Sequence, residues 1–195
     1  MPTPYGGTLQ EEDAVAGWWD EFYRAEHPYL EEPEPWLVDV LGSRGPGRAL
    51  DLGAGTGRHS IWLAANGWSV VAVDSSSVAM TELGRHVRET DATIRAVTAE
   101  LTEWDADGET FDAIIAAFVY QPSVFARLVR SLAPGGILVA VVHEASDHDR
   151  AQELAAALDG LARIELLESV RATSVARNAW TGEPEGHVRL IAHPV

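Results

Sequence analysis

A strand-like run at Ala49–Leu52 ends in three glycines at alternate positions, Gly53, Gly55 and Gly57, and a helical pattern follows. Glycine in such a turn adopts positive φ and lets the backbone approach a ligand closely. The N-terminus of the following helix offers unpaired N–H groups and the positive end of a dipole, which attract an anion. Ligands of open α/β sheets bind beyond the carboxyl ends of the strands, so this segment predicts a binding site.

The spacing of these glycines discriminates between ligands. A dinucleotide-binding turn has the pattern G-x-G-x-x-G, which needs its third glycine at position 58, but this chain has Arg58 there and glycine at Gly57. Asp51, two residues before the first glycine, would oppose a pyrophosphate and favour a cationic or amino-bearing ligand. The alternative is that neighbouring backbone amides satisfy this carboxylate. We therefore expect a ligand other than a dinucleotide.

Strand-like and helix-like segments alternate along most of the chain. The strand candidates are Ala49–Leu52, Ser69–Val73, Thr93–Thr98, Phe111–Val119, Ile137–Val142, Ile164–Val170 and His187–Ala192. The helix candidates are Val15–Tyr23, Trp36–Leu41, His59–Asn66, Met80–Val87, Val124–Leu132 and Leu154–Leu161. This rhythm, with strands that lack polar alternation, indicates an α/β fold with a parallel sheet covered by helices on both faces. No helical face lies between Val170 and His187, so we expect an antiparallel last pair.

The pattern Asp-x-Gly-x-Gly-x-Gly resembles the first motif of the class I S-adenosylmethionine-dependent methyltransferases. Asp74, Phe111–Ile115 and Leu132–Gly136 are similar to later motifs of that family, and the resemblance covers residues 48–142. The aromatic N-terminal helix and Gly57-Arg58-His59 resemble small bacterial members of the tellurite-resistance and thiopurine type. The resemblance implies a Rossmann-like, doubly wound, seven-stranded sheet, mostly parallel, with an antiparallel last strand.

The resemblance also implies which residues hold S-adenosylmethionine, or S-adenosylhomocysteine as the product. Asp74 would bind both ribose hydroxyls, because a carboxylate has two acceptor oxygens for two donors; the alternative is a solvated N-cap of the next helix. Glu100 and Leu101 would lie at the adenine, where the family often has Asp instead of Glu. The implied cofactor-binding residues are Asp51, Gly53, Ala54, Gly55, Gly57, Arg58, His59, Asp74, Ser75, Ser76, Glu100, Leu101, Ala117, Phe118, Trp19 and Tyr23.

The aromatic residues of Trp18–Tyr23 share one helical face and have two interpretations. Aromatic residues at this spacing usually pack into a core. In the family this segment covers the cofactor, and Trp19 and Tyr23 would then flank the sulfonium, because an aromatic face favours a cation. His59 also has two interpretations: a residue of the first helical turn, or a contact to cofactor or substrate.

The segment His143–Asp149 holds two His and three acidic residues after a buried strand. We expect no metal site there, because the chain has no other obvious ligand cluster and Ser146 and Asp147 suit the capping of a helix. His143 is instead the first candidate for a general base near neutral pH, and Tyr120 is the weaker one.

The predicted function is transfer of a methyl group from S-adenosylmethionine to a small-molecule acceptor by in-line displacement. The donor is already reactive, so alignment supplies much of the catalysis, on the order of 7–11 kcal/mol. Four segments would form the acceptor surface: Trp18–Tyr23, Phe118–Gln121, His143–Asp149 and Arg171–Gly186. The alternatives are a non-catalytic binder of S-adenosylmethionine and an NAD-dependent oxidoreductase. The glycine spacing and the absence of Lys oppose the oxidoreductase.

Composition limits the classes of protein to consider. A chain of 195 residues, 46% hydrophobic, is typical of one globular domain. We divide it into a loose tail at 1–13, a helical lid at 14–42 and a core at 48–195. Cysteine is absent, which excludes disulfides, thiolate nucleophiles and cysteine–zinc sites. All 14 basic residues are Arg, so Schiff-base and P-loop lysines are excluded as well.

The net charge of −16 sets expectations for partners and location. Such a surface repels nucleic acid and anionic membranes, and favours a neutral or cationic acceptor. The chain has no apolar run long enough to span a bilayer, and its N-terminus lacks the basic start and apolar stretch of a signal peptide. We therefore expect a cytoplasmic monomer or homodimer with no nucleic-acid or membrane partner.

Overall fold

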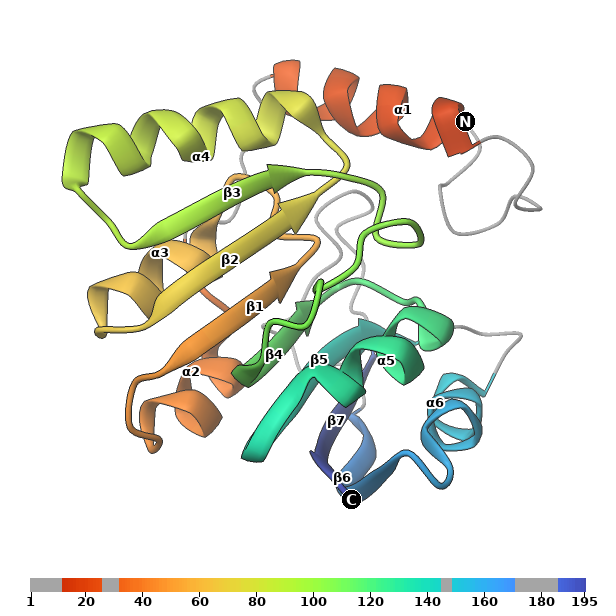
Figure 1. The fold of residues 1–195 in the computed structure, drawn as a ribbon. Helices are drawn as coiled ribbons and strands as arrows, with labels where there is room; N and C mark the ends of the chain where they lie inside the picture. Colours follow the sequence, from red (N-terminus) through yellow and green to blue (C-terminus); the bar gives the residue numbers. More distant parts are fainter. Residues whose placement is uncertain (1–11, 26–31, 145–148, 171–185) are drawn as a thin grey trace.

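The computed structural model describes residues 12–25, 32–144, 149–170 and 186–195, and its strands form one seven-stranded sheet of order β3-β2-β1-β4-β5-β7-β6 (Figure 1). The strands are β1 (Arg48–Leu52), β2 (Ser69–Asp74), β3 (Ile94–Thr98), β4 (Phe111–Ala117), β5 (Leu132–His143), β6 (Ala162–Val170) and β7 (His187–Pro194). The helices are α1 (Glu12–Arg24), α2 (Pro35–Gly42), α3 (Arg58–Ala65), α4 (Ser77–Thr90), α5 (Pro122–Leu128) and α6 (Arg150–Leu158). Strands β1 to β5 pair in parallel, whereas β7 is antiparallel to both β5 and β6. The predicted fold class is thereby confirmed.

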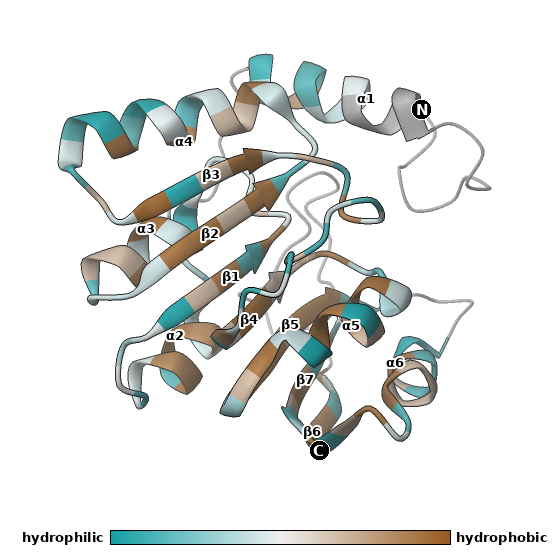
Figure 2. Ribbon diagram, in the orientation of Figure 1, coloured by the Kyte–Doolittle hydropathy of each residue, from teal (hydrophilic) through white to brown (hydrophobic). Residues whose placement is uncertain are grey.

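Alternation along the strands divides the core into two layers. In β1, Leu50 and Leu52 face the layer that contains α5 and α6, and Ala49 faces the layer that contains α2 and α3. Asp51 points the same way as Ala49, because side chains of a strand alternate between its faces. Figure 2 shows hydrophobic residues concentrated on the central strands, with hydrophilic residues along α1 and α4. Helices therefore cover both faces of the sheet, as expected.

Local sequence sets the starts of the helices. Pro35 opens α2, where its fixed φ suits the first helical position. Ser76 caps α4, and its hydroxyl accepts from the Ala79 N–H at 3.1 Å. Asp149 caps α6 by accepting from the Gln152 N–H at 2.9 Å. The cap was expected at Ser146 or Asp147, which lie outside the described residues.

Some element boundaries differ from those expected, most clearly around β4 and β5. Strand β4 ends at Ala117 instead of Val119, because Phe118 has φ 64° and leaves the extended conformation. Strand β5 begins at Leu132, earlier than Ile137, and its pairing with β4 is irregular between these residues. The preceding helix accordingly ends at Leu128 and is followed by a 3₁₀ turn. None of the helices in the described ranges has the length and apolar character needed to cross a membrane.

Helix α5 should contribute strongly to stability through Phe125, which is fully buried in the core layer that contains α5 and α6. Phe125→Ala should lower the free energy of unfolding by about 3–5 kcal/mol, because truncation leaves a cavity in a packed core. Urea denaturation measures this loss, and the dependence of the free energy of unfolding on urea concentration should stay unchanged. Ser123→Ala, an exposed position on the same helix, is the control. Equal unfolding midpoints for the two variants would contradict the prediction.

Candidate cofactor and acceptor site

The glycine bend joins β1 to α3 in a strained backbone path. Gly53, Gly55 and Gly57 have φ of 67°, 56° and 94°, the left-handed region that glycine tolerates and other residues avoid. A Cβ atom at Gly53 would overlap the side chain of Val119, and one at Gly57 would overlap Leu83. The bend therefore needs glycine both for its backbone conformation and for close packing against the segment that follows β4 and against α4.

Asp51 occupies the space under the bend and is 1% exposed. Its Oδ2 accepts from the Ser60 hydroxyl at 2.6 Å, and the Ser60 backbone N–H also bonds the carboxylate. The protein's own carboxylate thus takes up hydrogen-bonding capacity at the N-terminus of α3. The negative charge of Asp51 at this helix end disfavours a pyrophosphate there.

Asp74, at the end of β2, joins the bend to α4. Its Oδ2 accepts from the Gly55 N–H at 2.8 Å, and its Oδ1 accepts from the Ser76 N–H at 2.8 Å. The carboxylate is 8% exposed, so the alternative of a solvated helix cap is wrong; Ser76 is the cap of α4. A carboxylate has about four lone-pair sites, and the Ser75 N–H also bonds Asp74, so capacity for one further donor is left.

The two buried acids give the bend an excess of negative charge. Burial raises the pKa of Asp51 to about 6, and the nearby Asp74 carboxylate adds to the rise while Ser60 and Arg58 oppose it. Burial likewise raises the pKa of Asp74, with partial relief from the Ser76 and Gly55 N–H groups. Apolar surroundings disfavour each carboxylate, and the two disfavour each other. A ligand that brings positive charge and hydroxyl donors to this place would complement both.

A ring cluster lies beside the bend at the carboxyl ends of β4 and β5. The guanidinium carbon of Arg58 sits 5.4 Å from the centre of the Phe118 ring, and the Phe118 and His143 rings are 4.7 Å apart. His187, which pairs with His143 across β5 and β7, contributes a third ring 5.3 Å from Phe118. Phe118 has a positive φ, which is uncommon and strained for a bulky residue. Such backbone strain often occurs at functional sites. The fold thereby brings Arg58, Phe118 and His143 together.

His143 differs from the expected base with a pKa near neutrality. Burial lowers its pKa to about 4, and electrostatic interactions with His187, Arg150 and Arg58 add to this effect. The imidazole is therefore neutral at physiological pH. It can accept a proton, but more weakly than an unperturbed histidine.

Tyr120, the weaker candidate base, contacts α6. Its hydroxyl donates to the Glu153 carboxylate on α6, and Arg150 lies over its ring at 4.5 Å. Burial and the Glu153 carboxylate raise the pKa of Tyr120, so a phenolate base is disfavoured. Arg150, which sequence reasoning missed, also donates to the His143 carbonyl at 2.6 Å and so ties α6 to the end of β5.

His59 connects the bend to a different neighbour from the one expected. Its Nε2 accepts from the Glu34 N–H at 3.1 Å, at the start of α2, and the residue is 4% exposed. Burial and the Arg58 charge lower the pKa of His59 to about 3, so the ring is neutral. This geometry favours the structural interpretation of His59 over a cofactor contact.

The remaining predicted cofactor residues lie at the same edge of the sheet. Ser75 follows Asp74, and its backbone N–H also bonds that carboxylate. Leu101 is buried in the core, while Glu100 is half-buried. Ala54 is buried in the bend, and Ala117 ends β4. Their contacts to a ligand remain predictions.

The aromatic residues of α1 form a ladder of rings. Trp18 stacks on Phe22 at 5.8 Å, and Trp19 stacks on Tyr23 at 6.2 Å. All four are half-buried. Between them, Asp20 faces α4; it carries no sequence signal beyond being an acid within an aromatic segment.

Parts of the expected acceptor surface lie outside the described residues: 145–148 and 171–185, which include Trp180. Within the described residues no group of three or more His, Asp or Glu is placed to hold a metal ion.

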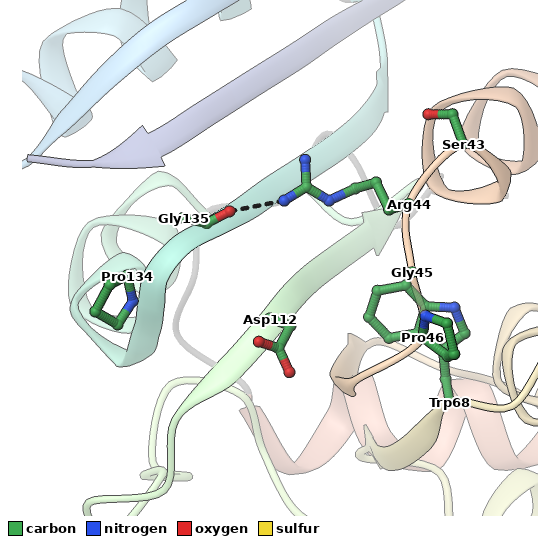
Figure 3. Close-up of a pocket in the computed structure, with 8 residues that line it drawn as sticks. All are labelled: Ser43, Arg44, Gly45, Pro46, Trp68, Asp112, Pro134 and Gly135. Atoms are coloured by element: carbon green, nitrogen blue, oxygen red, sulfur yellow. Dashed lines mark hydrogen bonds between the residues drawn. The ribbon is translucent and has the colours of Figure 1, made fainter.

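A hollow of about 390 Å³ lies at the opposite, amino-terminal edge of the sheet, lined by Ser43, Arg44, Gly45, Pro46, Trp68, Asp112, Pro134 and Gly135 (Figure 3). The Arg44 guanidinium donates to the Gly135 carbonyl at 2.7 Å across it. Ligands of open α/β sheets bind at the carboxyl edge, so the candidate site is the glycine bend and not this hollow.

Residues 49–136 match a family described as "Methyltransferase domain". Over this stretch the chain is similar to the class I S-adenosylmethionine-dependent methyltransferases. The strand order with a reversed β7 is that of this family, whose cofactor is S-adenosylmethionine.

Three proteins are similar to this chain. A demethylmenaquinone methyltransferase of Clavibacter sepedonicus is 41% identical over 97 residues, which are 47% of this chain and 39% of that protein. TehB of Haemophilus influenzae superposes with a TM-score of 0.70 at 15% identity, over 91% of this chain and 67% of TehB. The N-methyltransferase NodS of Bradyrhizobium japonicum, in complex with S-adenosyl-L-homocysteine, gives 0.71 at 17% identity, over 93% and 99%. The chain thus spans about two fifths of the length of the demethylmenaquinone methyltransferase. The similarity to the two solved structures supports the fold.

The buried carboxylate of Asp51 should lower the stability of this protein above mildly acidic pH. The folded state binds its proton more tightly than the unfolded state, so stability falls as pH rises from the ordinary pKa of 3.8 through about 6. Asp51→Asn, which keeps an acceptor for Ser60, should gain roughly 1–3 kcal/mol over the native chain near neutral pH and nothing near pH ~4.

Chemical denaturation across this pH range measures the difference. Asp39→Asn, an exposed acid on α2, should show a flat difference. A pH-independent effect of Asp51→Asn would rule out the buried charge as the cause.

Proposed function

We propose that the chain transfers the methyl group of S-adenosylmethionine to a small-molecule acceptor. The observation that carries this proposal is the pair of buried carboxylates, Asp51 and Asp74, at the glycine bend. Their negative charge suits a cationic donor, and the remaining acceptor site of Asp74 suits a ribose hydroxyl. No step of this chemistry needs a metal, a thiolate or a lysine.

The cofactor supplies an electrophilic methyl carbon next to a positively charged sulfur. The chain has to hold this group in line with the acceptor and keep water away. The glycine bend and Asp74 would hold the ribose and the amino-acid part of the cofactor. Asp51, buried under the bend, would add negative charge there. Arg58, which leads from the bend to the Phe118 ring, would separate the donor side from the acceptor side.

The acceptor would approach the ring cluster of Phe118, His143 and His187. These side chains are half-buried, and they present flat rings with a neutral imidazole among them. Such a surface suits a small, partly apolar acceptor. His143 would accept a proton only from an acceptor that carries one at neutral pH.

Two alternative functions are less well supported. A dinucleotide-dependent oxidoreductase would place a pyrophosphate at the N-terminus of α3, where Asp51 already bonds Ser60. A non-catalytic binder of S-adenosylmethionine would need the same carboxylates. The strained Phe118 and the clustered histidines favour the enzyme, because a binder alone has no use for them.

Cofactor affinity should depend on Asp74. Asp74→Ala should weaken S-adenosylhomocysteine binding by about 1–3 kcal/mol, because charge-assisted hydrogen bonds to the ribose are lost. Titration calorimetry of the two proteins measures this. Asp39→Ala on α2 serves as the control for loss of one negative charge. Unchanged affinity of Asp74→Ala would remove Asp74 from the site.

The two candidate bases can be separated by matched variants. With an acceptor found by release of S-adenosylhomocysteine across a small-molecule panel, His143→Gln should lower kcat by about 100-fold or more if the acceptor is deprotonated there. Tyr120→Phe should leave kcat within about twofold, because its hydroxyl is bonded to Glu153. The reverse ranking would assign the base to Tyr120. If no acceptor on the panel reacts while S-adenosylhomocysteine binds, the non-catalytic alternative gains support.

A further inference from the structure

Asp20 on α1 receives an unusual number of hydrogen bonds from another helix. Its Oδ1 accepts from the Ser76 hydroxyl at 2.7 Å and from the Val78 N–H at 3.2 Å. Its Oδ2 accepts from the Ser77 hydroxyl at 2.9 Å and, within α1, from the Arg24 guanidinium at 3.2 Å. A single carboxylate therefore docks α1 on the N-terminus of α4, where Figure 1 shows the two helices side by side.

The same bonds continue to the predicted ribose site. Ser76 donates its hydroxyl to Asp20 and its backbone N–H to Asp74 at 2.8 Å. Asp74 in turn accepts from the Gly55 N–H at 2.8 Å. A continuous chain of hydrogen bonds thus runs from α1 through the cap of α4 to the glycine bend. Of its side-chain members, Asp74 and Ser76 are buried, and the Asp20 side chain is 19% exposed.

The charge of Asp20 acts in the same place. Burial alone would raise its pKa, but hydrogen bonds from Ser76, Val78 and Ser77 together hold the pKa below its ordinary value. Asp20 is therefore ionised at neutral pH, next to the positive end of the α4 dipole. Its charge also raises the pKa of Asp74, which shows that the two carboxylates influence each other.

We propose that Asp20 is a positioning residue for the cofactor: by docking α1 on α4 it orients Ser76, and through Ser76 it orients the Asp74 carboxylate. This inference rests on the proposed function. It follows that docking of α1 and binding of the cofactor support each other, because a coupling free energy between two events is reciprocal.

Hydrogen-bond geometry, and not charge, should decide the effect of substitutions. Asp20→Asn keeps an Oδ1 atom for Ser76 and Val78, and its amide can donate to the Ser77 hydroxyl. Asp20→Ala removes every acceptor. Glu21→Ala, an exposed acid at the next position of α1, removes the same charge without contact to α4 and is the matched control.

S-adenosylhomocysteine affinity, measured by calorimetry, is the first readout. Asp20→Ala should bind about 10-fold more weakly, the equivalent of one or two lost hydrogen bonds, while Asp20→Asn and Glu21→Ala stay within about threefold of the native chain. With an identified acceptor, Asp20→Ala should raise KM for the cofactor and leave kcat at saturation nearly unchanged. A purely structural loss would instead lower the unfolding midpoint of Asp20→Ala without this separation of KM from kcat.

Hydrogen exchange of residues 17–24 is the second readout, taken with and without saturating S-adenosylhomocysteine. The ligand should slow exchange in the native chain and in Asp20→Asn, but much less in Asp20→Ala. Equal affinity of Asp20→Ala and the native chain, or exchange of α1 that ignores the ligand, would overturn the coupling while leaving the proposed function intact. Failure of the native chain to bind the ligand at all would instead overturn the proposed function, and the coupling with it.

Discussion

Two buried carboxylates beside a glycine bend constrain the rest of this structure. Asp51 and Asp74 are both nearly inaccessible to solvent, and each makes ionisation of the other more costly. The fold supplies Ser60 to one, and the Gly55 and Ser76 N–H groups to the other. Apolar residues in such positions are often more stabilising than buried charges. Their presence at the carboxyl edge of the sheet is best understood as a cost in stability that a cationic, hydroxyl-bearing ligand offsets.

The neighbouring ring cluster has the opposite electrostatic character. Burial, with added positive charge from Arg150 and Arg58, lowers the pKa of His143 and keeps its imidazole neutral. Arg58 belongs to both regions, because it also moderates the pKa of Asp51. A positively charged donor at the bend and an acceptor beside the neutral imidazole would thus lie on either side of Arg58. This separation of charge suits a transfer in which the protein's main task is alignment.

The link from α1 to the bend adds a second constraint on the same acids. Asp20 bonds the cap of α4, and that cap bonds Asp74. A helix that precedes the core in sequence therefore takes part in the geometry of the site. Transfer from a sulfonium requires that water be excluded, and a helix whose docking depends on the occupied site would do this at the right moment.

Much of the fold is determined by local sequence. The apolar runs of β1, β2, β4 and β5, the alternating helices and the turn-rich gap before β7 were enough to predict the sheet and its reversed last strand. These local patterns set the periodicity of each element and the points at which the chain turns, and both depend on neighbouring residues. The glycine spacing with Asp51 and Asp74 likewise pointed to the family, because backbone conformation and carboxylate chemistry are properties of single positions.

Only the tertiary structure decided how these groups are partnered. It bonded Asp51 to Ser60, tied Tyr120 to Glu153, turned His59 toward Glu34 and placed His187 beside His143. It also lowered the pKa of His143 and connected Asp20 to Asp74 through Ser76. The physical reason is that burial, electrostatic potential and hydrogen-bond partners come from residues distant in sequence, which no local pattern encodes.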